Sequence, residues 1–277
     1  LKSEGKEYRT LKLYGQEINL ITSAIARMNM FMHGIEEFSI VRGDTLAQPA
    51  FLHNDELKKF NVILANPPYS IKAWDRKNFE NDPYGRNLWG TPPQGCADYA
   101  FQQHIQKSLD TDNGRSISLW PHGVLFRDSE AEMRRKMIEE DLVECVIGLG
   151  PNLFYNSPME ACLLITKTNK SEDKKGKVLI INALKEVKQE KNMAFLQPKH
   201  IDTIFNCYKN FKDVDGFAKV VSTNEILENK GSLNIAQYVS NVNNSNEQLT
   251  IEQALTDWNN QSDKLKESMN QLFEILK

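Results

Sequence analysis

Two patterns of apolar residues alternate along the first 240 residues of the chain. Short apolar runs predict seven strands, at 11–14, 38–44, 60–68, 115–121, 142–149, 161–167 and 177–183. Apolar residues three or four positions apart predict three helices, at 15–34, 97–109 and 128–140. Strands that alternate with helices are typical of an α/β fold, in which helices cover both faces of a mostly parallel sheet.

Polar side chains lie at the ends of three predicted strands. Glu17 comes just after the first strand, Asp44 ends the second, and Asn66–Tyr69 end the third. Ligands of open α/β sheets bind beyond the carboxyl ends of the strands, so these residues are candidates for one binding site. Each residue alone could equally cap a helix or a turn, whereas all three together favour a site.

The chain changes character near residue 240. A polar linker at 241–248 precedes a predicted helix whose apolar residues follow a narrow heptad stripe. The stripe consists of Ile251, Leu255, Trp258, Leu265, Met269, Leu272 and Leu276, with the polar Ser262 between them. We therefore predict a main domain over 1–240, and a linker with a C-terminal helical extension over 241–277. The stripe favours docking on a partner helix, although a helix folded back on its own domain would show the same pattern.

Composition narrows the classes of protein. The 277 residues carry a net charge of −3, so a polyanion would have to be bound by local basic residues or by a partner. The four cysteines show neither a Cys-x-x-Cys motif nor the spacing of a metal site, and buried thiols are expected for Cys145 and Cys162. No apolar run is long enough to cross a bilayer. These features predict a cytoplasmic protein with no membrane contact and no metal.

The stretch ILANPPYS at 63–70 carries the clearest chemical signal. A site for an exocyclic amine needs acceptors, and the Asn66 side-chain oxygen is one. The Pro67 carbonyl is a second acceptor, because Pro68 has no N–H and restricts Pro67 to extended conformations. Two acceptors fix both amine protons and leave the nitrogen lone pair for an electrophile. Tyr69 offers a flat face for a planar base or amide, and a base reaches such a pocket only after it leaves the duplex.

The motif ANPPYS resembles the signature of S-adenosylmethionine-dependent DNA adenine methyltransferases. Other stretches make the chain similar to the modification (methyltransferase) subunit of type I restriction-modification systems: YGQEIN, ARMNMFMHGI, GDTL, ADYAF, PHGVLFR, LVECVIGLGPNLFYNSPMEACLLI and LNIAQYV. Their order and spacing match from about Leu13 to Val239. The resemblance implies a Rossmann-like methyltransferase fold over 1–240. It also implies transfer of a methyl group from S-adenosylmethionine to the N6 amine of a flipped adenine.

The resemblance implies a role for each matching residue. Glu17 would hold the ribose hydroxyls of the cofactor, and Asp44 would lie near its adenine amine. Asn66, Pro67, Pro68 and Tyr69 would form the catalytic motif, with Asn66 also facing the cofactor and Tyr69 stacked on the target base.

Three further residues have open assignments. Phe126 is expected either as a second aromatic wall or as a core residue. Asp98 is expected to line the site or to cap a helix, and Phe154 to line the site or to belong to the core. No metal is required for this chemistry.

The resemblance also implies partners. These are duplex DNA, a specificity subunit that docks on the C-terminal helix, a restriction subunit, and a second copy of the chain. In such a complex the mild acidity of the chain is expected, because the specificity subunit supplies much of the grip on DNA.

One departure from the family pattern concerns the glycine-rich loop that follows the first strand of the family fold. The chain begins ten residues before LKLY, and no such loop precedes that strand. We therefore expect a truncated chain, a gap in the sheet and weak binding of the cofactor by this chain alone. Two alternatives stay open: a protein-glutamine methyltransferase, whose amide substrate fits the same motif, and a non-catalytic assembly subunit.

Overall fold

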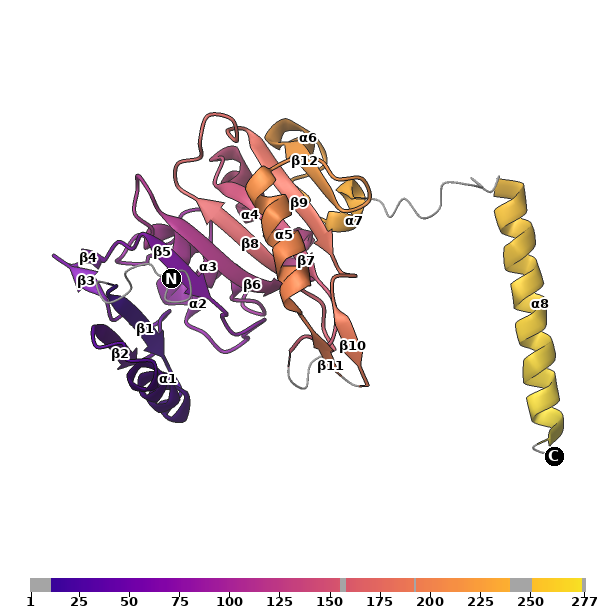
Figure 1. Cartoon of the computed structure of the whole chain (residues 1–277), viewed down its shortest axis with the longest axis horizontal. Coiled ribbons are helices and arrows are strands. Elements are labelled where there is room, and N and C mark those ends of the chain that lie inside the picture. The colour runs from indigo at the N-terminus through magenta and orange to yellow at the C-terminus, as the bar shows by residue number, and fades with distance from the viewer. Residues whose placement is uncertain (1–10, 155–157, 192, 240–250, 276–277) are drawn as a thin grey trace. The chain divides into compact units, whose positions relative to one another are not determined.

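The chain comprises two units, Leu1–Ser240 and Asn241–Lys277 (Figure 1). The computed structural model describes residues 11–154, 158–191, 193–239 and 251–275. None of the helices in these ranges is long and apolar enough to span a bilayer.

The elements of the described residues follow the predicted order. The strands are β1 (Leu13–Glu17), β2 (Phe38–Arg42), β3 (Leu52–His53), β4 (Glu56–Leu57), β5 (Val62–Ala65), β6 (Arg115–Pro121), β7 (Val143–Leu149), β8 (Ala161–Lys167), β9 (Lys177–Ala183), β10 (Lys188–Glu190), β11 (Met193–Phe195) and β12 (Ala218–Ser222). The helices are α1 (Leu20–Met32), α2 (Arg76–Glu80), α3 (Asp98–Lys107), α4 (Ala131–Glu139), α5 (Pro198–Asn210), α6 (Thr223–Glu228), α7 (Ile235–Tyr238) and α8 (Ile251–Ile275), with short 3₁₀ helices η2 (His122–Leu125) and η3 (Asp128–Glu130). The seven predicted strands correspond to β1, β2 and β5–β9, and the three predicted helices of the main domain to α1, α3 and α4.

The central sheet has six strands in the order β12-β9-β7-β8-β6-β5. β5 is parallel to β6, and β7 is parallel to β9. β8 lies between β6 and β7 and is antiparallel to both, and β12 is antiparallel to β9 at the edge. Four of the six strands therefore point the same way, which confirms the predicted mostly parallel sheet. The reversed β8 in its centre was not predicted.

A separate parallel pair is formed by β1 and β2. β5 is the outer strand of the central sheet, and its Val62 and Leu64 side chains are exposed. The apolar face of α1 is exposed too, including Ile25, Met28 and Phe31. Within the described residues, the sheet is thus interrupted between β1 and β5, and the apolar periodicity of α1 does not correspond to a buried face.

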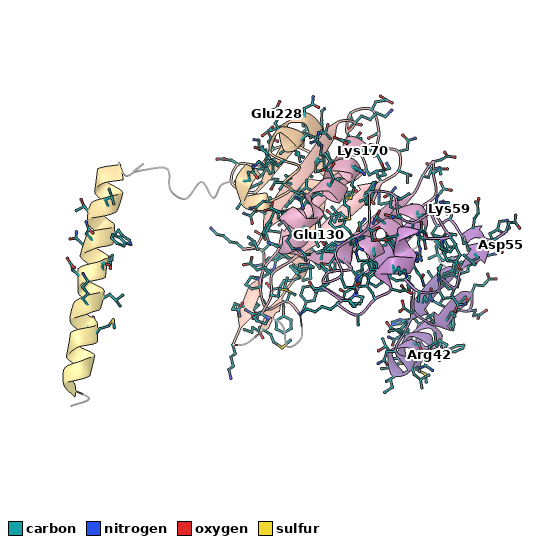
Figure 2. The ribbon with its side chains drawn as sticks, turned by 180° about the vertical axis from the view of Figure 1, so that it is seen from behind. Arg42, Asp55, Lys59, Glu130, Lys170 and Glu228 are labelled. Atoms are coloured by element: carbon teal, nitrogen blue, oxygen red, sulfur yellow. The ribbon has the colours of Figure 1, made fainter. Side chains whose placement is uncertain are left out.

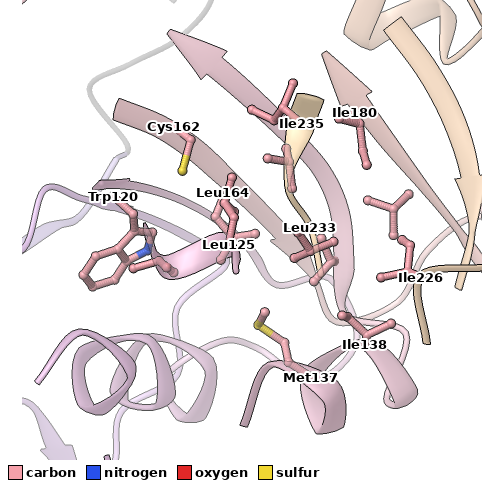
Figure 3. Packing of buried hydrophobic residues seen from close by; sticks show 14 of the residues in the cluster. Trp120, Leu125, Met137, Ile138, Cys162, Leu164, Ile180, Ile226, Leu233 and Ile235 are labelled. Atoms are coloured by element: carbon pink, nitrogen blue, oxygen red, sulfur yellow. The ribbon is translucent and has the colours of Figure 1, made fainter. Parts of the chain in front are cut away.

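Alternate residues of the central strands pack on opposite faces of the sheet. Met137 of α4 and Ile235 of α7 belong to one buried cluster (Figure 3), and Val146 of β7 is a member of the same cluster. The next residue, Ile147, belongs to a second cluster that includes Cys207 of α5. Figure 1 shows α5 across one face of this sheet, with α3 and α4 on the other. Because both faces are covered, every residue of β7 is buried.

The four cysteines are free and buried, as predicted for Cys145 and Cys162. In the second unit, α8 is a single helix over 25 residues. Its stripe residues Leu255, Trp258, Leu265 and Met269 are exposed.

Candidate active site

The residues Asn66, Pro67, Pro68 and Tyr69, called here the NPPY segment, follow β5 directly. The Tyr69 hydroxyl donates a hydrogen bond to Asn66 Oδ1, with an oxygen–oxygen distance of 3.0 Å. No backbone N–H of the described residues donates to the Pro67 carbonyl. Asn66 is exposed, and its side-chain oxygen has a second lone pair. Both the second lone pair of Asn66 Oδ1 and the Pro67 carbonyl are therefore without a backbone donor among the described residues.

Tyr69 lies against an indole ring that is itself fixed. The ring centroids of Tyr69 and Trp120 are 6.5 Å apart, with their planes inclined by 44°. Trp120 is fully buried, and its Nε1–H donates to Gln102 Oε1 at 3.0 Å and to Ser118 Oγ at 2.8 Å. Burial raises the pKa of the Tyr69 hydroxyl, and Cys162 and Asp98 raise it further. The hydroxyl therefore keeps its proton at neutral pH and can donate to Asn66.

The backbone turns immediately after Tyr69. Ser70 adopts a left-handed conformation with φ of 51°, and its N–H donates to Asp98 Oδ1 at 2.7 Å. Asp98 is the first residue of α3, and only 1% of its surface is exposed. The N-cap of α3 is Ala97, and the Asp98 carboxylate binds Ser70 and Arg127 rather than an N–H group of α3. The structure thus contradicts both assignments made from the sequence, because Asp98 neither lines an open site nor caps α3.

Phe126 follows η2, and 45% of its surface is exposed. The core assignment of Phe126 is therefore wrong. The ring is available as an aromatic wall, and this role stays a prediction.

A buried polar cluster surrounds the guanidinium group of Arg127. Its Nη1 donates to Cys96 Sγ at 2.7 Å, its Nη2 donates to Asp98 Oδ2 at 2.5 Å, and its Nε is 3.1 Å from Glu130 Oε2. Cys96, Asp98 and Glu130 are close enough together to hold a metal ion, but Arg127 contacts all three and supplies the positive charge.

Burial shifts the pKa values of this cluster, whose members Cys96, Asp98 and Glu130 are buried; Glu130 is labelled in Figure 2. Burial raises the pKa of Glu130, although Arg127 opposes the rise. Burial also raises the pKa of the Cys96 thiol to about 11. Burial lowers the pKa of Arg127, but its hydrogen bond to Asp98 and the charge of Glu130 outweigh this and raise it. The cluster is therefore built around a permanent Arg127 cation and a neutral thiol.

Glu17 and Asp44 lie at neighbouring strand ends, because β1 and β2 are paired and parallel. Glu17 is the last residue of β1, and its Oε1 accepts from the Asn19 N–H at 2.7 Å. Asp44 follows β2, and its Oδ1 accepts from the N–H groups of Leu46 and Ala47 at 2.9 and 3.2 Å. In both carboxylates the other oxygen accepts no hydrogen bond from the described residues. These two oxygens are available to a ligand.

The turn that carries Asp44 is held by a residue that sequence reasoning missed. Arg86 donates to the carbonyls of Thr45 and Leu46, at 2.9 and 2.8 Å. It also forms an ion pair with Asp82 at 2.6 Å, and both side chains are 2% exposed. The available signal was the i,i+4 spacing of Asp82 and Arg86 in the polar loop at 70–97.

The candidate residues fall into two groups. The first group is Asn66–Tyr69 together with Phe126: Ser70 and Arg127, the residues that follow Tyr69 and Phe126, both bind Asp98. Glu17 and Asp44 form the second group. No hydrogen bond or ion pair of the described residues joins the groups directly. The loop at 70–97 connects them, with Ser70 at its start, Arg86 in its middle and Cys96 at its end.

Phe154 belongs to neither group. It lines an apolar pocket of about 410 Å³ together with Leu119, Leu149, Leu153, Leu163, Ala194, Phe195 and Leu196. Phe154 packs, partly buried, against a core cluster that Tyr69 also contacts, so the core assignment is supported and its role as a lining residue stays a prediction.

Comparison with known proteins gives consistent results. Residues 1–247 match the family model described as N-6 DNA Methylase. The chain is 34% identical to the type I restriction enzyme MjaVIII methylase subunit of Methanocaldococcus jannaschii over 96% of its length. It is 33% identical to the MpnII methylase subunit of Mycoplasma pneumoniae over 87% of its length. The chain spans about half the length of these curated relatives, 46% in each case.

Solved structures show the same relationship. The type I restriction-modification methyltransferase subunit from Streptococcus thermophilus has a TM-score of 0.77 and 36% identity, and the match covers 84% of this chain and 49% of that one. A class I S-adenosylmethionine-dependent methyltransferase from Listeria monocytogenes has a TM-score of 0.52 at 17% identity, with coverage of 72% and 55%. The second match supports the fold alone.

Proposed function

Because the chain belongs to the N-6 DNA methylase family, we propose that it is the catalytic part of a type I modification subunit that methylates N6 of adenine in DNA. The NPPY segment carries this proposal. Its Asn66 oxygen is oriented by Tyr69, and its Pro67 carbonyl is left free of backbone hydrogen bonds. An adenine N6 amine has two protons, which match these two acceptors.

The described residues fit part of S-adenosylmethionine. A vicinal diol offers two hydrogen-bond donors, and the open oxygen of Glu17 is an acceptor for such a group. The open oxygen of Asp44 is an acceptor for an aromatic amine. Both carboxylates are oriented by backbone N–H groups, so they are preorganised for donors. We propose that Glu17 holds the ribose hydroxyls and that Asp44 lies at the adenine amine.

The chain's own residues prepare the nucleophile. Asn66 Oδ1 and the Pro67 carbonyl accept the two amine protons, and the nitrogen lone pair is left to form the new bond to carbon. One amine proton is lost to solvent afterwards. When bound, S-adenosylmethionine supplies a methyl group on a sulfonium, and that carbon–sulfur bond breaks with its electron pair retained by sulfur. Tyr69 would provide the stacking face, and Phe126, whose side chain is exposed, would be the second aromatic wall.

Adenine reaches these acceptors only when it is extruded from the duplex. The net charge of −3 gives the chain no general attraction to DNA. We propose that a specificity subunit supplies this attraction and docks on the exposed apolar stripe of α8. A restriction subunit and a second copy of the chain complete the proposed complex.

The test is Asn66→Ala in the full-length, partner-bound protein, with transfer of a labelled methyl group to duplex DNA as the measurement. We expect the rate to fall by about 10²-fold or more, as for other preorganised groups at a reacting centre, while the complex still assembles. Asn113→Ala is the matched control, since Asn113 is an exposed asparagine in a turn outside the site. It should leave the rate unchanged.

Other outcomes identify the alternatives. Retained DNA methylation in Asn66→Ala would overturn the proposed role of Asn66. Methylation of a glutamine peptide but not of DNA would support a protein-glutamine methyltransferase. Assembly without transfer to either substrate in the wild-type protein would support a non-catalytic subunit.

A further inference from the structure

The NPPY segment ends in a backbone conformation that needs support. Ser70 is not glycine, yet its φ of 51° lies in the left-handed region. Such conformations cost free energy and persist when surrounding contacts enforce them. Among the described residues, the Ser70 N–H donates to one side chain, Asp98, with a distance of 2.7 Å to Oδ1. The direction of the chain just after Tyr69 therefore depends on Asp98.

The second oxygen of Asp98 binds a different part of the chain. Arg127 Nη2 donates to Asp98 Oδ2 at 2.5 Å. The Asp98 side chain is fully buried, and an unpaired carboxylate in such a position would be strongly unfavourable. One carboxylate thus uses both oxygens, one for the backbone beside Tyr69 and one for the residue beside Phe126.

Arg127 is fixed along its whole length. Its backbone N–H donates to the Gly123 carbonyl at 2.9 Å, and its own carbonyl accepts from the buried Arg134 at 3.1 Å. A Cβ atom on Gly123 would come within 3.0 Å of Arg127 Nε, so the glycine makes room for this side chain. Phe126 is the preceding residue, and its own N–H also donates to the Gly123 carbonyl. The turn that presents Phe126 is therefore as firmly placed as the guanidinium group.

We infer that Asp98 and Arg127 are positioning residues that set the relative placement of Tyr69 and Phe126, the two aromatic side chains proposed to enclose the target base. This inference rests on the proposed function. A stacked base needs a slot of defined width, and two walls carried by separate loops hold that width only when the loops are tied together. The buried ion pair is the tie, and neither of its members is among the acceptors proposed for the adenine amine.

The experiment uses the full-length, partner-bound protein with Asp98→Asn and Asp98→Ala. Asparagine keeps an acceptor for the Ser70 N–H but loses the charge that pairs with Arg127, whereas alanine loses both. Glu139→Gln is the control, because Glu139 forms an exposed ion pair with Arg135 at 2.8 Å in α4. Melting temperatures identify any variant that does not fold, and Asp98→Asn keeps the test valid if Asp98→Ala fails to fold.

Three readouts separate positioning from general stability. Hydrogen–deuterium exchange of a peptide spanning 64–74 reports the Ser70 amide. Fluorescence of 2-aminopurine at the methylated adenine position reports enclosure of the flipped base. Steady-state kinetics separate kcat from the KM for S-adenosylmethionine.

We expect kcat to fall at least tenfold in Asp98→Ala and by a smaller factor in Asp98→Asn, with the KM for S-adenosylmethionine changed less than twofold. Hydrogen–deuterium exchange at 64–74 should rise, and the fluorescence of 2-aminopurine should change. Both effects should be larger in Asp98→Ala than in Asp98→Asn. Unchanged exchange at 64–74 in the alanine variant would show that Asp98 does not fix the turn, and increased exchange with unchanged kcat would show that the turn does not matter. Either result overturns the inference. A wild-type protein that methylates no DNA would overturn the proposed function, and the exchange at 64–74 would still decide whether Asp98 fixes the turn.

Discussion

The Tyr69 hydroxyl donates a hydrogen bond of 3.0 Å to Oδ1 of Asn66, three positions earlier in the NPPY segment. This bond gives Tyr69 two roles in the proposed site. Its ring offers a stacking face, and its hydroxyl orients the amide whose oxygen is to accept an amine proton. The sequence suggested only the first role, since a phenylalanine ring would stack equally well.

Tyr69→Phe should therefore lower the rate of methyl transfer modestly rather than leave it unchanged. Loss of one hydrogen bond of about 0.5–1.5 kcal/mol corresponds to roughly a twofold to tenfold decrease in kcat. Tyr69→Ala should lose a further ~1–3 kcal/mol of stacking. Tyr238→Phe is the matched control, because it removes a hydroxyl that donates to the Ser232 carbonyl at 2.8 Å outside the site. An unchanged kcat in Tyr69→Phe would show that the hydroxyl does not orient Asn66.

Arg86→Met should destabilise the protein and weaken binding of the methyl donor. It would leave the buried Asp82 unpaired, which costs about 3–5 kcal/mol, and would free the Thr45 and Leu46 carbonyls of the turn that carries Asp44. Thermal unfolding and isothermal titration of the full-length protein measure the two effects. Arg135→Met, at the exposed pair with Glu139, should change neither. If Arg86→Met binds S-adenosylmethionine as tightly as the wild type does, Arg86 does not support the proposed cofactor site.

His104 should make the protein less stable at acidic pH. Burial and the nearby Arg86 lower its pKa to about 3 from the usual value of 6.5, and no described residue bonds its buried Nδ1. Below pH 6.5 the unfolded chain binds a proton that the folded protein does not, so stability falls as pH falls toward 3, by at most about 1.4 kcal/mol per pH unit. In urea unfolding between pH 6.5 and 4, His104→Gln should show a shallower fall than the wild type. An identical slope would contradict the lowered pKa.

The apolar stripe of α8 should carry the contact with the specificity subunit. Trp258→Ala and Leu265→Ala remove side chains that are 67% and 62% exposed. Each should weaken co-purification of the partner at least tenfold without changing the melting temperature of the main unit. Asn260→Ala, on the opposite side of the same helix, should have no effect. Equal binding by the Leu265 and Asn260 variants would remove the stripe from the interface.

The sequence by itself determined the local parts of this protein. Short continuous apolar runs predicted β6–β9, because strands covered on both faces need apolar residues on both sides. The diproline predicted that the Pro67 carbonyl would stay outside a helix, since a residue that precedes proline is restricted to extended conformations. The positions of Glu17 and Asp44 at the ends of two strands were also predicted from the sequence.

Only the tertiary structure decided which distant residues meet. The reversal of β8 between β6 and β7 depends on pairing between strands far apart in sequence, which a single strand's pattern does not encode. Asp98 was assigned to a lining or capping role, yet its carboxylate binds Ser70 and Arg127, 28 and 29 positions away. Arg86 was not singled out, because a loop arginine is usually solvated. Local chemistry sets what a residue can bond, whereas the packing of the whole chain sets which partners come within reach.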